Sequence, residues 1–404
     1  MVTGHPLFVT FFMLGAIVFF TGFALRLFLY WRGQWDSWAL VRGVFSTLFS
    51  EKILKLIKIM FLDGILQRRL FGQDKLRWLM KVLIMIGYPG ILIAGHLKVE
   101  MMPQFEKLPH LIRFFYAPFC DFYYFHDVAS PSLSFSDALF AISFDLFGAM
   151  ILTGEFIAIY RRFVAKAATF KTSIGDMVAV NLLGGWFILR FFCEATSLLT
   201  YSLPNSVAQY WFLSFGLSKI IAPLGLPWSS LNYPLWSISG LFLATLVAFI
   251  PYNKKLWHII TIPVIMFINL MPKEAFKPGA RKTPLPLSVK ELIALDSCVK
   301  CGSCVGVCPV YAQTQQLETT MGGFFSNLRS FIRKAYGLPG VFFGTTKTRE
   351  VPKEYSEYPY LCTLCGRCTM VCPAFIDTKD LRIATRGFMV EKRRSEERRE
   401  AKQC

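Results

Sequence analysis

Charged residues are scarce in this sequence, and the acidic ones are the scarcer kind. Asp, Glu, Lys and Arg together make up 17% of the 404 residues, whereas a soluble chain of ordinary composition carries about a quarter. This shortage argues against a soluble globular protein. Apolar residues are abundant instead, at 54% with 40 Phe. The composition therefore predicts that most of the chain lies in lipid.

The deficit of acidic residues leaves a net charge of +18, from 44 Lys and Arg against 26 Asp and Glu. A basic chain of this kind can indicate nucleic-acid binding, but the sequence contains no recognised basic and aromatic reader motif. In membrane proteins, basic residues collect beside the cytoplasmic ends of the spans and meet anionic lipid. We therefore expect contact with the lipid bilayer and no nucleic-acid partner.

Five apolar runs are long enough to cross a hydrocarbon core of roughly 30 Å at 1.5 Å per residue. The first has no basic segment before it and no small-residue cleavage site after it, so we interpret it as a span and not as a signal peptide. The expected spans lie at about residues 6–25, 78–97, 135–160, 177–203 and 234–251.

The distribution of Lys and Arg predicts the orientation of these spans. Residues 26–81 carry eleven basic residues and residues 161–176 carry four, whereas residues 98–134 carry three and residues 203–233 carry one. Because basic loops stay in the cytoplasm, we expect the N-terminus outside and everything after the fifth span inside. The inner loop includes residues 49–62, which we expect to form an amphipathic helix that either lies in the membrane interface or packs on a neighbouring part of the protein.

The composition changes after the fifth span. We expect a membrane domain over residues 1–271, a Pro-rich basic linker over 272–287, a cytoplasmic domain over 288–390 and a charged tail over 391–404.

Eight of the eleven cysteines form two runs with the same spacing and a following proline. This spacing is that of bacterial ferredoxins, in which the fourth cysteine of each run ligates the other of two cubanes. One cluster would be held by Cys298, Cys301, Cys304 and Cys372, and the other by Cys362, Cys365, Cys368 and Cys308. Structural zinc is the alternative, but zinc sites use four ligands in two pairs and do not match this spacing.

Two stretches carry a family resemblance. Residues 309–361 separate the cysteine runs and include a helical pattern near 320–336, which resembles the α-helical ferredoxin domain of succinate dehydrogenase and of the heterodisulfide reductase protein HdrC. LQRRLFGQDKLRWLM before the second span and DLFGAMILTGEFIAIYRR in the third resemble the gamma subunit of nitrate reductase and the heterodisulfide reductase protein HdrE. The resemblance implies an all-α protein, with a five-helix transmembrane bundle followed by a cytoplasmic α-helical ferredoxin domain.

The resemblance also implies two b-type haems bound by four histidines, of which this sequence keeps only His96 and His258. These two lie near opposite faces of a core about 30 Å thick, so they cannot share one iron. An outer haem b would need His96 together with His5, His110 or His126, and an inner one would need His258 with a ligand such as Lys81.

Without haems, nothing recognisable carries electrons across the lipid, so we expect a quinone to react near the inner face. The candidates there are Lys81, Glu155 and His258, because ionisable residues inside a membrane are costly and usually functional. Lys81 has an alternative interpretation as an anchor that reaches the interface, and Asp176 is predicted to cap the fourth helix. Deeper in the membrane, Arg190 and Glu194 are four residues apart and can form an ion pair or a proton route.

We therefore expect a membrane electron-transfer subunit of an anaerobic respiratory-type complex in the inner membrane of a prokaryotic cell. It would pass electrons between a (mena)quinone pool and a cytoplasmic partner similar to heterodisulfide reductase, through two [4Fe–4S] clusters. The sequence contains no adjacent cysteines, so the heterodisulfide chemistry would belong to that partner. The alternatives are a self-sufficient ferredoxin:quinone oxidoreductase and a redox-silent membrane anchor with a relay domain.

Overall fold

The protein is helical throughout the part of the chain that the structure describes. The structure is a computed structural model, and it describes residues 6–33, 35–127, 134–166, 170, 174–276, 287–336, 358–387 and 390. Within these ranges there are helices and connections and no β-strand. The predicted tail at 391–404 and most of the predicted linker at 272–287 lie outside the described residues.

Five helices are long and apolar enough to cross a membrane, which confirms the predicted number of spans. They are α1 (Leu7–Trp31), α5 (Lys75–Glu100), α8 (Phe135–Ile159, continued by a π-helical turn to Val164), α9 (Ile174–Thr200) and α12 (Trp228–Phe249). Polar side chains set two of their beginnings: Asp74 accepts the Arg77 backbone N–H at 3.0 Å, and Ser134 accepts that of Asp137 at 3.2 Å. These two spans, α5 and α8, therefore begin where a capping side chain precedes an apolar run.

The chain forms two compact units, which are described separately. The first contains residues 1–22, 74–166 and 173–253. In this unit α5 packs on α8, and α9 packs on α12. The α5–α8 contact is close because a Cβ at Gly154 would lie 3.0 Å from the Met80 carbonyl oxygen and 2.7 Å from Ile84 Cγ1. A larger side chain at this position would separate the two spans.

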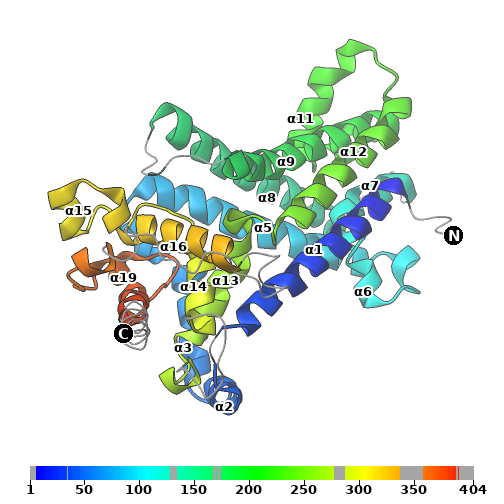
Figure 1. Ribbon diagram of the computed structural model, residues 1–404. Helices are drawn as coiled ribbons and strands as arrows, with labels where there is room; N and C mark the ends of the chain where they lie inside the picture. The colour runs from blue at the N-terminus through cyan, green and yellow to red at the C-terminus, as the bar shows by residue number, and fades with distance from the viewer. Residues whose placement is uncertain are drawn as a thin grey trace, which may run out of the picture. The chain divides into compact units, whose positions relative to one another are not determined.

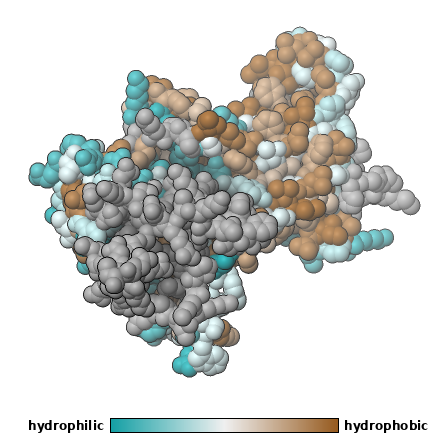
Figure 2. Space-filling view, in the orientation of Figure 1, coloured by the Kyte–Doolittle hydropathy of each residue, from teal (hydrophilic) through white to brown (hydrophobic). Residues whose placement is uncertain are grey.

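The short helices of the first unit lie between the spans. These are α6 (His110–Arg113), α7 (Cys120–Asp127), α10 (Asn205–Ala208) and α11 (Phe212–Ile221). The apolar helix α11 continues as a 3₁₀ turn to Leu224 and packs on α9. Figure 2 shows hydrophobic surface over α9, α11 and α12, as expected for helices that meet lipid.

The second unit contains residues 23–73, 167–172 and 254–404. Its helices are α2 (Ser37–Leu48), α3 (Lys52–Ile59), α4 (Arg68–Phe71), α13 (Lys254–Ile268), α14 (Val289–Ser297), α15 (Pro309–Thr314), α16 (Met321–Tyr336) and α19 (Arg367–Val371). The helices predicted near 49–62 and 320–336 are present as α3 and α16. Figure 1 shows α13 beside α14, which it contacts. Both cysteine runs belong to this unit, together with segments that flank the first, second and fifth spans.

Candidate iron–sulfur centres and buried polar sites

The two cysteine runs share one backbone conformation. In each run, the residue before the second cysteine and the glycine after it have positive φ: 54° at Lys300, 84° at Gly302, 55° at Leu364 and 76° at Gly366. These turns direct backbone N–H groups toward sulfur, and Leu364 donates its N–H to Cys362 Sγ at 3.4 Å. Amide donors around a concave loop favour a negatively charged ligand set. Both runs are thus shaped to hold thiolates.

The fourth cysteine of the first run meets the second run. Cys308 lines one cavity together with Cys362, Cys365 and Cys368, and Cys304 also borders this cavity. This is the crossover that ferredoxin spacing requires. Cys365 is the exposed member of the set.

The fourth cysteine of the second run lies near the first run. Removal from water and the neighbouring Cys301 and Cys298 raise the pKa of Cys372 to about 12. Burial also raises the pKa of Cys304, followed by the influence of Cys298, Cys301 and Cys372. Because iron binds thiolates, loading this site releases protons. Among the described residues, no three side chains of His, Cys, Asp or Glu converge on a site for a single metal ion.

The beginning of α16 lies against the first site. The Gly322 backbone bonds to Cys304, and a Cβ at Gly322 would be 3.5 Å from Cys304 Sγ. The next glycine has no room for a side chain, since a Cβ at Gly323 would collide with the Leu317 carbonyl oxygen. The positive end of a helix dipole thus faces the sulfur of Cys304, a predicted ligand. The sequence analysis missed this pair, although two adjacent glycines were a visible signal.

Arg382 is a buried cation beside the second site, and the sequence analysis missed it too. Its side chain lines the cavity of the second run and is 1% exposed. It donates to the Thr319 carbonyl at 3.2 Å and lies 4.0 Å from the centre of the Phe324 ring. Burial lowers the pKa of Arg382, and the nearby cysteines oppose this effect. It therefore places positive charge where cluster-bound thiolates would be negative.

The turn after Cys372 is held by segments next to the spans. Arg69 donates to the Cys372 carbonyl at 3.0 Å and lies 3.6 Å from the Phe375 ring centre. Gln73 donates to the Val371 carbonyl at 3.0 Å, and Asn269 donates to that of Phe375 at 2.8 Å. Arg69 and Gln73 belong to the stretch that resembles HdrE.

The approach to Cys298 is held by the end of the first span. Asp296, at the end of α14, accepts hydrogen bonds from Arg26 at 2.8 Å and from the Tyr30 hydroxyl at 2.7 Å. The Trp257 indole of α13 donates to the same hydroxyl at 2.8 Å. The first site therefore has contacts to membrane-flanking helices on both sides of its ligand set.

The predicted quinone residues are divided between the two units. Glu155 is 4% exposed, and its Oε2 atom has no hydrogen-bond partner. The hydroxyl of Tyr88, a residue that the sequence analysis missed, lies near this carboxyl group and also has no partner. Lys81 is half-buried in the first unit, and His258 is half-buried in α13 of the second. The structure thus groups Glu155 with Tyr88.

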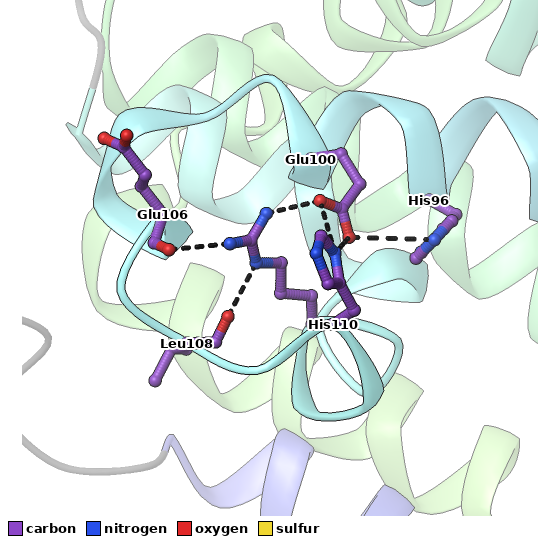
Figure 3. A network of polar contacts seen from close by, with 6 residues as sticks. His96, Glu100, Glu106, Leu108 and His110 are labelled. Carbon is purple, nitrogen blue, oxygen red and sulfur yellow. Dashed lines mark hydrogen bonds and ion pairs between the residues drawn. The ribbon is translucent and has the colours of Figure 1, made fainter.

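Two of the candidate haem ligands share a carboxylate. The Glu100 carboxylate lies 3.7 Å from His96 Nε2 and 3.0 Å from His110 Nδ1, and Arg113 binds the same carboxylate (Figure 3). His96 and His110 therefore lie beside the same carboxylate. His5 and the side chain of His126 lie outside the described residues.

Two other polar predictions have different outcomes. The Arg190–Glu194 pair is present, with 2.8 Å between Nε and Oε1. The prediction that Asp176 caps the fourth helix was wrong, because α9 already begins at Ile174 and Asp176 lies in its first turn. Arg162 compensates its charge there at 3.6 Å.

The fold and the cysteine geometry define a helical membrane protein that carries an iron–sulfur domain with two sites. The family model of the 4Fe–4S dicluster domain matches residues 294–376. No solved structure matches the chain.

The similar curated proteins include components of heterodisulfide reductases of Methanosarcina species. The dihydromethanophenazine:CoB–CoM heterodisulfide reductase protein HdrE of Methanosarcina thermophila is 27% identical over 214 residues, which are 53% of this chain and 66% of that protein. The HdrD protein of the Methanosarcina mazei enzyme is 36% identical over 122 residues, 28% of this chain and 29% of that protein. The iron–sulfur subunit 2 of an Hdr-like menaquinol oxidoreductase of Archaeoglobus fulgidus is 34% identical over 92 residues, 22% of this chain and 17% of that protein.

The chain thus spans under a third of the length of the HdrD relatives that it matches. These similarities confirm the resemblance: a membrane part like HdrE is joined to a helical ferredoxin part of the heterodisulfide reductase type.

Proposed function

We propose that this protein is the membrane electron-transfer subunit of a respiratory complex that connects a quinone pool with a redox partner similar to heterodisulfide reductase. The observation that carries the proposal is the crossover of the cysteine runs, in which Cys308 joins Cys362, Cys365 and Cys368 at one cavity. Two [4Fe–4S] clusters, when bound, supply one-electron transfer. The printed name of the Archaeoglobus fulgidus relative, a menaquinol oxidoreductase subunit, supports menaquinone as the quinone.

The two sites differ in their surroundings, and this difference suggests their roles. The first site, of Cys298, Cys301, Cys304 and Cys372, adjoins groups held by Arg26 and Arg69 beside the spans. The second site includes the exposed Cys365. Large apolar side chains near it are exposed as well, 51% at Tyr360 and 77% at Met370. We assign the first site to the quinone side and the second to the partner.

The quinone is proposed to react near Glu155 and Tyr88, because Glu155 Oε2 and the Tyr88 hydroxyl are buried and have no hydrogen-bond partner. A carboxyl group there can take or give the proton that accompanies quinone chemistry. Lys81 and His258 remain candidates for the quinone carbonyl. With the N-terminus outside and the ferredoxin domain in the cytoplasm, this placement needs no haem b between quinone and cysteine sites. Carboxylate-bound His96 and His110 then act as interfacial polar groups.

Cysteine variants of the full chain in proteoliposomes test this order. After reduction by dithionite, menaquinone confined to the bilayer should reoxidise the first cluster of Cys365→Ser at the wild-type rate, as followed by electron paramagnetic resonance. In Cys301→Ser, the second cluster should stay reduced. Wild-type reoxidation of the second cluster in Cys301→Ser would contradict the assignment. An unchanged rate in Glu155→Gln would contradict the placement of the quinone beside Glu155. If menaquinone reoxidises neither cluster of the wild type, the protein is a redox-silent membrane anchor. Steady turnover of the isolated chain with soluble ferredoxin and quinone would identify a self-sufficient reductase.

A further inference from the structure

Among the buried ionisable residues of the first unit, four lie together where α7, α8 and α9 meet. Their exposed fractions are 3% for Asp121 in α7, 0% for Asp145 in α8, and 3% and 1% for Arg190 and Glu194 in α9. We call these four residues the carboxylate cluster. Asp145 is ten residues from the beginning of α8 and ten from Glu155, or about 15 Å along the helix in each direction. The cluster is therefore deep inside the bundle and separate from the Glu155 site.

Arg190 binds two of the three carboxylates directly. Its Nε donates to Glu194 Oε1 at 2.8 Å, its Nη2 donates to Asp121, and its Nη1 donates to the Pro118 carbonyl at 3.0 Å. The guanidinium also lies 5.1 Å from the Phe144 ring centre. No donor of Arg190 in these contacts reaches the third carboxylate.

That third carboxylate, Asp145, meets the beginning of α11. Its Oδ2 accepts the Leu213 backbone N–H at 2.6 Å, while its Oδ1 has no hydrogen-bond partner although it is buried. Ser214 donates to Glu194 Oε2 at 2.7 Å, so α11 contacts two of the three acids. A fully buried carboxyl oxygen without a donor is expected to carry a proton itself or to accept a hydrogen bond from a bound water.

The net charge of the carboxylate cluster also indicates that it holds a proton. Fully ionised, the cluster would have three negative charges and one positive charge. A cation outside it, Lys98 of α5, is bound to Asp137 of α8, so this pair adds no net charge. Cys120 and Cys193 adjoin the cluster, and burial raises the pKa of Cys120, so its thiol adds no charge. A net charge of minus two inside lipid is unfavourable, and each bound proton removes one unit of it.

We propose that the carboxylate cluster is a proton-binding site that holds at least one exchangeable proton on Asp145 or Glu194 in the resting protein. The site takes a proton from water or a hydronium ion, and no electron moves in this step. Its position between Glu155 and the beginning of α8 allows it to exchange protons with the side of the membrane at which α8 begins. The proposal stands independently of the quinone assignment, because a resting proton can be observed without turnover.

Infrared spectroscopy of the full chain in liposomes tests the site. A carbonyl band of protonated carboxylic acid should be present at neutral pH, shift in D₂O and disappear in Asp145→Asn or Glu194→Gln. The change to Asn is isosteric and keeps an oxygen for the Leu213 N–H, so this variant should fold. The matched control is Asp74→Asn, because the hydrogen bond from Arg161 lowers the pKa of Asp74 and keeps it ionised.

The outcomes are distinct. Loss of the band in a cluster variant, with the control unchanged and the helical circular dichroism intact, supports the proposal. If the band is absent from the wild type, or persists in Asp121→Asn, Asp145→Asn and Glu194→Gln alike, the proposal is wrong. Neither result depends on iron content or on quinone, so a failure of the electron-transfer proposal would be seen separately.

Discussion

At the scale of single residues, two arginines four positions apart shape the second cysteine site. Arg382 is buried against the cavity. Arg386 donates to the Pro359 carbonyl at 2.9 Å and to the Cys362 carbonyl at 2.5 Å. Both belong to the helix at 378–387 and therefore lie on one of its faces. Such positive charge stabilises the reduced, more negative form of a bound cluster.

Replacing the buried arginine should lower the reduction potential of that cluster. In Arg382→Gln we expect a decrease on the order of 1 kcal/mol per electron, or a few tens of millivolts, because a cation is removed from a weakly screened site. A redox titration followed by electron paramagnetic resonance measures it. The control is Arg367→Gln, which removes an exposed arginine at the same cavity and should shift the potential less. Equal shifts in the two variants would contradict the role of burial.

No sequence motif identified the residues that surround the predicted ligands. The spacing of the cysteines identified the eight candidate ligands, because it follows directly from the size of a cubane and the reach of a loop. Arg382, Gly322 and Tyr88 contact the sites only after the chain has folded, and their neighbours in sequence show no pattern of their own. Local spacing can therefore predict a ligand set but not the charges and amides around it.

At the scale of secondary-structure elements, the predicted number of membrane helices and the all-helical fold were correct because the length of an apolar run is a local signal. The packing of the 67–73 segment against the turn after Cys372 was not predictable, since it joins residues about 300 positions apart, such as Arg69 and Cys372. The π-helical turns Met60–Ile65 and Tyr160–Val164 also went unpredicted. Each turn directly follows an α-helix, and the apolar pattern of that helix continues into the turn without a change that would indicate it.

The beginning of α16 is the element whose position matters most for the first site. A methyl group at Gly323 would meet the Leu317 carbonyl, so Gly323→Ala must displace the helix and its amide contact with Cys304. We expect a loss of about 1–3 kcal/mol in the free energy of unfolding of the iron-loaded chain. Urea titration of the cluster absorbance measures this loss.

The control for that variant is Gly306→Ala in the same domain. A Cβ at Gly306 would have nothing within 4 Å. The urea midpoint of Gly306→Ala should therefore stay near that of the wild type. A similar midpoint for both variants would show that α16 can shift without affecting the site.

At the scale of the whole molecule, the first span belongs to both units. Residues 7–22 of α1 pack in the first unit, and its remaining residues pack in the second, where Arg26 and Tyr30 bind Asp296. The membrane bundle and the cysteine domain therefore share one continuous helix. Composition predicted the existence of both parts, but no local pattern indicated that this helix contributes to each.

The iron content of the whole chain should be about eight, as expected for two [4Fe–4S] clusters. In Cys308→Ser we expect a decrease to about four, with loss of the signal of the cluster held by Cys362, Cys365 and Cys368, because Cys308 completes that cavity. Iron analysis and electron paramagnetic resonance check this outcome. Cys120→Ser, a buried thiol of the first unit, is the control and should keep all of the iron. Loss of the other cluster in Cys308→Ser would overturn the crossover.

The crossing of the two cysteine runs has a consequence for biosynthesis. Cys308 is translated more than fifty residues before Cys362, Cys365 and Cys368, the other three predicted ligands of its cluster. Cys372, which belongs to the first site, is the last of the eight cysteines to be translated. An assembly factor that delivers iron during translation would therefore find only incomplete sites until the end of synthesis. Maturation must wait for the nearly finished chain, and a product truncated before Cys372 would be unable to close its first site.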